Sequence, residues 1–321
     1  MNHHVSRIES LYKVMLRIRR VEETIAERYA TQEMRCPVHL SIGQEAVAAG
    51  VCAALSHQDG VFSSHRAHAH YLAKGGDLKR MLAEIYGKAE GCCKGVGGSM
   101  HMIDLAAGFL GAVPIVGATV PLAVGAAWAA RLRGEDKVIV VFFGDGTFEE
   151  GVVFESINFA VLHRLPVLFV CENNLYACYT RLSTRQADRT IHGVAAACGC
   201  QAIITDGNDA LAVFDATSRA VTALRAGSQP VFLECSTYRW REHCGPNIDD
   251  DLDYRPGEEV AEWKAACPIN RLATMLDAMP ECQDFMINTE REIGEEINEA
   301  FIYALAGEIP QQADLAGYLY A

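Results

Sequence analysis

Basic side chains are scarce in this sequence and nowhere clustered. The 321 residues include 28 Lys and Arg against 41 Asp and Glu, which gives a formal net charge of −13. Binding to nucleic acid requires clustered Lys and Arg opposite the phosphates, so this charge pattern excludes a nucleic-acid-binding protein. A dense acidic run, Asp249 to Asp253 followed by Glu258 and Glu259, is interpreted as a solvated loop.

Long apolar runs are also missing. No run approaches the roughly 20 residues of a membrane-spanning helix, and no apolar core of a secretory signal follows Met1 to Arg7. Glu22 and Glu23 lie in the first helical pattern, where a transit peptide would avoid acidic residues. We therefore expect no membrane association and a location in the bacterial cytoplasm.

The pairing pattern Cys-x-x-Cys is absent, although the chain has twelve cysteines. Most are scattered through apolar segments, as at Cys52, Cys171 and Cys235, in a chain much longer than disulfide-stapled domains. Cys92-Cys93 and Cys198-Gly199-Cys200 are spaced too closely for an ordinary tetrahedral zinc site. The pattern predicts free thiols, buried or partly exposed, in a reducing compartment.

Linkers, internal repeats and low-complexity tracts are lacking too, so we expect one domain over residues 1–321. An amphipathic helix over Ile8 to Tyr29 forms most of an N-terminal helical extension, 1–36, and a C-terminal helical segment covers 255–321. Further helices are predicted over 44–56, 77–86, 117–130, 258–265, 268–278 and 284–306. The alanine-rich helix over 117–130 is expected to be buried.

From Val138 onward, short apolar runs alternate with helical patterns. The strands are expected over 138–143, 167–171, 202–204 and 231–235, and the helices between them over 152–162 and 208–226. This alternation predicts an α/β fold in which a parallel sheet is flanked by helices on both faces.

The most telling motif is Gly144-Asp145-Gly146 at the end of one strand, with Asn173-Asn174 near the end of the next. Ligands bind at the carboxyl ends of parallel strands, and glycines let the backbone approach an anion closely. The helical pattern over 149–165 would direct its free N–H groups to the same place. Because a carboxylate and an amide oxygen suit magnesium, the motif favours a magnesium-bound diphosphate.

Two other phosphate sites fit the glycines less well. A dinucleotide-binding turn needs a third glycine where this chain has Glu149, and that carboxylate would repel an uncomplexed phosphate. The cluster Gly91 to Gly98 lacks the Gly-Lys-Ser/Thr ending of a P-loop, and by itself it is typical of a mobile surface loop.

The spacing of Gly-Asp-Gly and Asn-Asn resembles the signature of thiamine-diphosphate enzymes. Most of the chain is similar to one family, the alpha subunit of the first component of the 2-oxo acid dehydrogenase complexes, of the pyruvate and acetoin type. The matching segments are His39 to Ala46, Ser64 to His68, Gly97 to His101, Ile115 to Ala118 and Cys171 to Asn174. The resemblance implies the diphosphate-type thiamine-diphosphate-binding fold and places Gly91 to Gly98 at the active-site entrance.

The resemblance also implies the residues of the site. The magnesium ligands would be Asp145, Asn174 and the Tyr176 carbonyl. The other cofactor-binding residues would be Arg66, His65, Ile115, Val116, Gly144, Gly146, Thr147 and His243, with Asn174 contributing to both groups. A guanidinium suits a phosphate because its fork of donors can meet two anionic oxygens.

Three histidines are the implied catalytic residues: His243, His39 and His101. An imidazole can shuttle protons near neutral pH, although it is equally at home in a buried hydrogen bond. His243 corresponds to the family's His-Gly-His loop, in which this chain has Arg241 in place of the first His. Cys244 stands where regulated animal enzymes carry a phosphorylated Ser, so kinase control is not supported.

The implied activity is decarboxylation of a small 2-oxo acid, or cleavage of acetoin, with transfer of the acyl unit to lipoamide. A separate beta subunit would carry the pyrimidine-binding domain and the activating glutamate, in a heterotetramer with two copies of each chain, and a lipoyl acyltransferase is a further expected partner. Two alternatives stay open: acetyl transfer to a ketone such as a nucleotide-linked keto sugar, and a non-catalytic scaffold or regulatory subunit.

Overall fold

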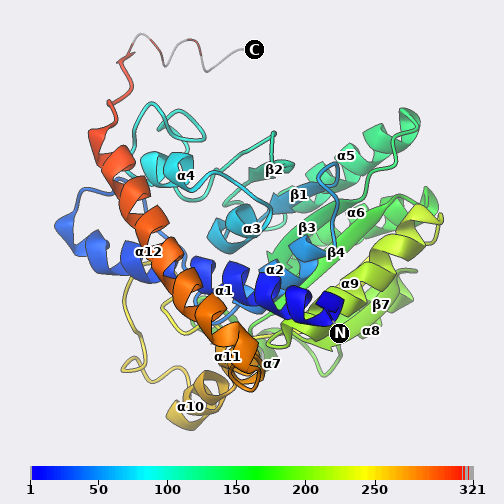
Figure 1. Cartoon of the computed structure of the whole chain (residues 1–321). Coiled ribbons are helices and arrows are strands. Elements are labelled where there is room, and N and C mark those ends of the chain that lie inside the picture. The colour runs from blue at the N-terminus through cyan, green and yellow to red at the C-terminus, as the bar shows by residue number, and fades with distance from the viewer. Residues whose placement is uncertain (1, 313, 315–316, 318–321) are drawn as a thin grey trace.

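A sheet of six parallel strands lies at the centre of the computed structural model, which describes residues 2–312, 314 and 317 (Figure 1). The order across the sheet is β2-β1-β3-β4-β8-β7, and every neighbouring pair is parallel. The strands are β1 (Gly60–Ser63), β2 (Phe109–Ala112), β3 (Ile139–Gly144), β4 (Val167–Asn173), β7 (Gln201–Asp206) and β8 (Val231–Ser236). The predicted α/β fold is confirmed.

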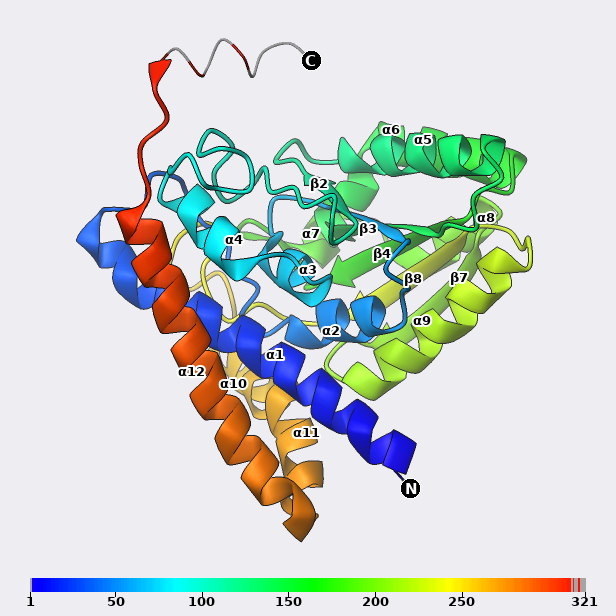
Figure 2. The ribbon, with the colours of Figure 1, turned by 45° about the horizontal axis from the view of Figure 1, so that its top comes forward.

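Both faces of the sheet are covered by helices, as Figure 2 shows. On one face Val140 and Phe142 of β3 pack in a core with α2 (Glu45–Ala53) and α9 (Ala210–Arg225). On the other face Val141 and Phe143 pack in a core with α5 (Thr119–Leu132), α6 (Gly151–Leu162) and α8 (Ile191–Ala197). Because alternate residues are buried on opposite faces, the strands are continuous apolar runs in the sequence.

A helical layer formed by the two ends of the chain lies outside the α2 face. The helices α1 (Asn2–Arg28) and α12 (Gln283–Ala306) pack against each other, with α12 crossing α1 in Figure 1 and lying next to it in Figure 2, and ion pairs join Lys13 to Glu292 and Arg17 to Glu296. This layer confirms the predicted terminal helices. Residues 1, 313, 315–316 and 318–321 of the two predicted terminal segments lie outside the described residues.

The remaining elements are short or lie around the sheet edges. They are η1 (Tyr29–Thr31), α3 (His68–Ala73), α4 (Leu78–Ile85), η2 (Asp145–Glu149), β5 (Tyr176–Ala177), β6 (Thr180–Arg181), α7 (Leu182–Arg185), α10 (Gly257–Ala265), α11 (Pro268–Asp277) and η3 (Pro280–Cys282). Over the residues that the structure describes, no helix has both the length and the apolar character needed to span a membrane.

The helix predicted as buried over 117–130 is α5, and that prediction was wrong for one of its faces. Its small residues, such as Ala123 and Ala127, face the core, whereas Leu122, Trp128 and Leu132 are 50%, 41% and 73% exposed. Alanines pack closely against the sheet, and the larger apolar side chains therefore point outward.

The acidic run is also not a simple solvated loop. Asp249 is buried, and its carboxylate pairs with the buried guanidinium groups of Arg239 and Arg255. A buried carboxylate is tolerated when cations and hydrogen bonds compensate the loss of hydration. Asp249 therefore anchors the segment that follows β8, while Asp250 pairs with Lys264 at the surface.

Two strands of the central sheet, β1 and β2, were not predicted, and neither was the short hairpin β5–β6. The strands β1 and β2 each have only four residues, which is too short for a periodic pattern to stand out from its neighbours. Their pairing extends the sheet beyond β3, and β1 delivers the Ser64 to Arg66 segment to the same edge as the Gly-Asp-Gly turn.

Candidate functional site

A cavity of about 180 Å³ opens at the carboxyl ends of the central strands β1, β3, β4 and β8. Ligand sites of open α/β sheets lie at this edge. The cavity is lined by Gln44, Ser64, His65, Arg66, Val116, Gly144, Asp145, Gly146, Thr147, Glu149, Glu172, Asn174, Tyr176, Ala177, Cys178 and His243. It thus brings together most of the residues that the sequence singled out.

Asp145 and Asn174 lie next to each other because their strands pair in register. Gly144 of β3 is opposite Glu172 of β4, so the residues that follow these strands emerge at one rim. The Asn174 amide donates to Gln44 Oε1 at 3.0 Å, and its Oδ1 accepts from the Tyr176 N–H at 3.3 Å. These bonds fix the direction of the Asn174 oxygen.

The Asp145 carboxylate is almost fully buried, and burial raises its pKa although Arg185 acts in the opposite direction. The Arg185 guanidinium binds both Asp145 and Glu149, and its Nε donates to the Thr180 carbonyl at 3.0 Å. A protein cation therefore already neutralises the carboxylate that the sequence identifies as a metal ligand.

These contacts test whether a divalent cation fits. The charge of Arg185 stands where a metal ion would bring positive charge, and the surrounding donors are hard oxygens of the kind that magnesium prefers. Gly146 leaves little room for a side chain, since a Cβ there would lie 3.0 Å from the Ala177 Cβ. The oxygen donors and the tight backbone turn fit a metal-bound anion, on condition that Arg185 gives way.

Three imidazoles gather at the site: His65 and His243 line the cavity, and His39 packs against both of them. The ring centroids of His39 and His65 are 4.6 Å apart, and His243 lies 5.2 Å from the first and 5.3 Å from the second. Arg66 lies behind them and donates to the carbonyls of Leu40 at 2.5 Å and His243 at 3.1 Å. This guanidinium joins the chain segments that carry His39 and His243.

The electrostatics around these rings favour neutral imidazoles. Burial, with the charge of Arg66 as the next cause, lowers the pKa of His39 to about 2, of His65 to about 4 and of His243 to about 3. Burial also lowers the pKa of Arg66 to about 10, which leaves it charged near neutral pH. An anion at this site would therefore meet the positive charge of Arg66 and uncharged imidazole rings.

A buried relay lies beneath the cavity floor. His70 Nε2 lies 3.3 Å from the Glu172 carboxylate, its Nδ1 bonds the Ser63 hydroxyl at 2.8 Å, and its ring stacks on Phe142. Glu172 lines the cavity, and the His70 ring lies next to its carboxylate. No sequence motif identified His70, because Ser63 and Glu172 beside it come from β1 and β4.

Three predicted residues lie outside the cavity lining: His39, which reaches it only through its contacts with His65 and His243, and His101 and Ile115. His101 is exposed, with its Nδ1 at 2.8 Å from the Gly97 carbonyl, and Ile115 is 69% exposed beside the lining residue Val116. The Gly91 to Gly98 segment is likewise absent from the lining. Four N–H groups of that segment and its neighbourhood, those of Cys93, Gly95, Gly97 and Gly98, donate instead to the buried Glu84 carboxylate.

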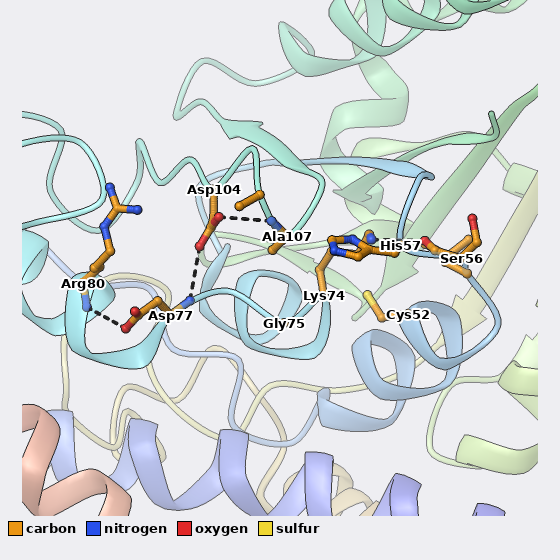
Figure 3. A pocket seen from close by; sticks show the side chains of 11 residues that line it. Cys52, Ser56, His57, Lys74, Gly75, Asp77, Arg80, Asp104 and Ala107 are labelled. Carbon is orange, nitrogen blue, oxygen red and sulfur yellow. Dashed lines mark hydrogen bonds between the residues drawn. The ribbon is translucent and has the colours of Figure 1, made fainter. Parts of the chain in front are cut away.

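The cysteines and a second pocket do not form a competing site. All twelve cysteines are free thiols. A pocket of about 560 Å³ beside α3 contains none of the predicted residues (Figure 3). Its carboxylates are already used by the backbone, since Asp104 accepts from the Asp77 and Ala107 N–H groups and Asp77 accepts from the Arg80 N–H.

Sequence reasoning missed several residues of the cavity. Gln44 lies within the matched segment that begins at His39, and Glu149 and Glu172 lie beside the two motifs, so proximity in sequence could have identified them. No sequence signal indicated Arg185, because it lies on the short helix α7 and its partner Asp145 is 40 positions away in the sequence.

Comparison with known proteins gives a consistent family. The dehydrogenase E1 component model matches residues 13–312. The chain is 45% identical over 315 residues to the alpha subunit of acetoin:2,6-dichlorophenolindophenol oxidoreductase of Bacillus subtilis, covering 97% of this chain and 92% of that relative. It is 39% identical over 319 residues to the alpha subunit of the pyruvate dehydrogenase E1 component of Zymomonas mobilis, covering 98% and 89%.

Proposed function

This chain belongs to the dehydrogenase E1 component family, and from that premise we propose that it is the alpha subunit of a heteromeric thiamine-diphosphate-dependent enzyme. The enzyme decarboxylates a small 2-oxo acid, or cleaves acetoin, and transfers the acyl unit to lipoamide. The observation that carries the proposal is the convergence of Asp145, Asn174 and Arg66 on one cavity at the carboxyl ends of the strands.

Magnesium and the diphosphate take the residues of that cavity. Asp145, Asn174 and the Tyr176 carbonyl hold the metal, while Arg66 and the turn at Gly146 and Thr147 bind the anion. The remaining cofactor contacts are those of His65, Ile115, Val116, Gly144 and His243. When bound, thiamine diphosphate supplies the nucleophilic carbon and the electron sink of the reaction.

The histidines serve binding and proton transfer. His243 and His39 are uncharged around neutral pH because burial lowers their pKa values, and negative charge that develops on the substrate beside them would raise those pKa values and let either ring accept a proton. His101 is assigned a proton-transfer role as well, although it reaches the cavity only if the loop that carries it moves. This loop is held by Glu84, whose carboxylate accepts hydrogen bonds from four backbone N–H groups.

A beta subunit completes the site. The apolar outer face of α5, defined here by Leu122, Trp128 and Leu132, is the proposed docking surface, and Val116 at the rim of the cavity precedes the same helix. The assembly contains two copies of each chain, and a lipoyl acyltransferase accepts the acyl unit. We treat residues 1–321 of the alpha subunit as one domain.

Between donors, the relatives support both pyruvate and acetoin, since the two matched enzymes are named for them. The complete set of Asp145, Asn174, Arg66 and His243 argues against a non-catalytic scaffold, which would not need to keep them. No feature of the cavity selects a keto sugar as acceptor in place of lipoamide.

Calorimetric titration of thiamine diphosphate with magnesium into the co-purified alpha and beta chains tests the proposal. We expect saturable binding to the parent and its loss in Asp145→Ala, because the metal loses its charged ligand. Asp188→Asn, which removes an exposed carboxylate elsewhere, is the matched control and should bind like the parent. Retention of cofactor by Asp145→Ala would refute the metal assignment. Assays on pyruvate and acetoin with an artificial electron acceptor then identify the donor.

A further inference from the structure

The three imidazoles at the cavity satisfy a geometric condition beyond anion binding. One nitrogen each from His39, His65 and His243 can be chosen so that all three lie within 4.8 Å of one another. The rings meet edge to face in every pair. Three imidazole nitrogens that converge on one point are the donor set of a tetrahedral metal site with an open fourth position.

An unpartnered buried atom points to a ligand in the same place. His39 is 6% exposed, and its Nδ1 has no hydrogen-bond partner although it is fully enclosed. A buried polar atom without a partner costs free energy, which a metal–nitrogen bond would recover. This unpartnered atom belongs to His39, the ring that both His65 and His243 contact.

The backbone that carries the imidazoles is held in position by contacts remote from the rings. Arg66 binds the carbonyls of Leu40 and His243, and the Gly245 N–H donates to the Val38 carbonyl at 2.8 Å. These bonds join the segment of His39 to the segment of His243. Small rotations of the side chains would then suffice to bring the nitrogens to metal–nitrogen distances of about 2.0–2.1 Å.

We propose that His39, His65 and His243 form a site for a late first-row divalent metal ion, such as zinc or cobalt, separate from the magnesium ligands. Imidazole favours these ions over magnesium, which prefers oxygen. The nearby charge of Arg66 repels every cation, so only an ion that gains strong bonds to nitrogen is retained. Its fourth position faces the cavity and takes water or an anion.

Occupation of this site excludes the diphosphate. His65 and His243 line the cavity together with Arg66, and a metal bound to their nitrogens would occupy the space next to that guanidinium. Zinc or cobalt would therefore inhibit cofactor binding by direct competition. This competition rests on the proposed function, whereas metal binding to the three imidazoles does not.

Cobalt titration of the co-purified alpha and beta chains, without thiamine diphosphate, tests the site by visible absorption. We expect one equivalent of cobalt per alpha chain to give the ligand-field bands of a four-coordinate site. The absence of thiolate-to-cobalt charge-transfer bands would distinguish imidazole ligands from cysteine ligands. His65→Gln and His243→Gln should each lower cobalt affinity more than tenfold. His57→Gln, an exposed histidine of the pocket in Figure 3, is the matched control and should bind like the parent.

The outcomes separate the two ideas. Cobalt binding of unchanged affinity in both variants, or a spectrum dominated by thiolate bands, would overturn the three-imidazole site. Saturation with thiamine diphosphate and magnesium should suppress the cobalt spectrum, and an undiminished spectrum would overturn the competition. A pair of chains that binds cobalt in this way but never binds thiamine diphosphate would refute the proposed function and leave the metal site standing.

Discussion

At the residue scale, the protonation state of His39 depends strongly on its surroundings. Its ring is enclosed by His65, His243 and the charge of Arg66, and burial is the largest cause of its lowered pKa of about 2. An imidazole of ordinary pKa would be partly charged at the pH of many cells. Here the folded protein keeps the ring neutral.

This neutrality has a predictable effect on stability. The pKa of His39 is near 6.5 when the chain is unfolded and about 2 when folded, so below about pH 6.5 the unfolded state binds more protons. Stability is therefore fully present above that pH and is lost as pH falls toward the folded pKa. The expected loss from this group is about 1.4 kcal/mol per pH unit within the window.

Chemical denaturation at about pH 7 and about pH 5 measures that loss. The first pH lies above the unfolded-state pKa of His39, and the second lies between its unfolded-state and folded-state pKa values. His39→Asn should show a smaller decrease in unfolding free energy between the two conditions than the parent. His57→Asn, which changes an exposed ring, should retain the parent's decrease. If His39→Asn and the parent lose equal stability, the folded protein does not hold this imidazole neutral.

At the scale of elements, the short helix α7 places a guanidinium against the predicted metal ligand Asp145. Arg185 is the last residue of α7, and its guanidinium bridges Asp145 after β3 and Glu149 of η2. Gln186 adds a bond from its side-chain amide to Glu149 at 3.0 Å. The segment is thus fastened to the Gly-Asp-Gly turn chiefly by charge.

Arg185→Gln should change two properties of the cofactor-free protein in opposite directions. Divalent metal affinity should rise, about tenfold or more, because the ion no longer competes with a guanidinium for Asp145. Stability without metal should fall by about 3–5 kcal/mol, because a buried carboxylate loses its partner. Manganese binding followed by electron paramagnetic resonance, together with denaturant unfolding, measures both.

The control for that variant is Arg181, the last residue of β6, which directly precedes α7. Arg181 pairs with Glu259 and not with Asp145, so Arg181→Gln removes the same charge without freeing the predicted metal ligand. It should leave manganese affinity close to that of the parent. Equal affinity in Arg185→Gln and the parent would mean that the guanidinium does not obstruct the metal.

At the scale of the whole molecule, the outer face of α5 is unusual for a helix that covers a sheet. Leu122, Trp128 and Leu132 leave a row of large apolar side chains exposed, and the ring of Trp128 is braced by Phe159 and His163. Contiguous apolar surface of this kind marks interaction sites in proteins. Only the start of α5 lies near the cavity, because the lining residue Val116 precedes the helix.

Leu122→Glu should prevent assembly with the beta subunit while the alpha chain still folds, because the substitution places a charge at a surface that must lose its water. Co-expression followed by size-exclusion chromatography with light scattering reports the assembly, and thermal melting reports the fold. Ile287→Glu on α12, where the native side chain is also exposed, is the matched control. A normal assembly of Leu122→Glu would exclude this face as the interface.

The sequence sufficed for features that depend on neighbouring residues. The apolar runs predicted β3, β4 and β8 because both faces of these strands are buried, and a shorter run predicted the edge strand β7, which is partly exposed. The turn at Asp145 followed from its place after a strand, and Asn174 followed in the same way. The four-residue strands β1 and β2, and the outward face of α5, lacked a local pattern that could reveal them.

What the sequence by itself determined was therefore the α/β class, the family and the two residues at the rim, since strand periodicity and glycine turns act over a few positions. Only the tertiary structure decided that His39, His65 and His243 meet, that Arg185 neutralises Asp145 and that Asp249 is buried between two arginines. Those contacts join segments that are far apart in the sequence or that lie on irregular loops. Their geometry depends on the order of the strands and on the packing of each loop, and no local pattern of side chains specifies either of these.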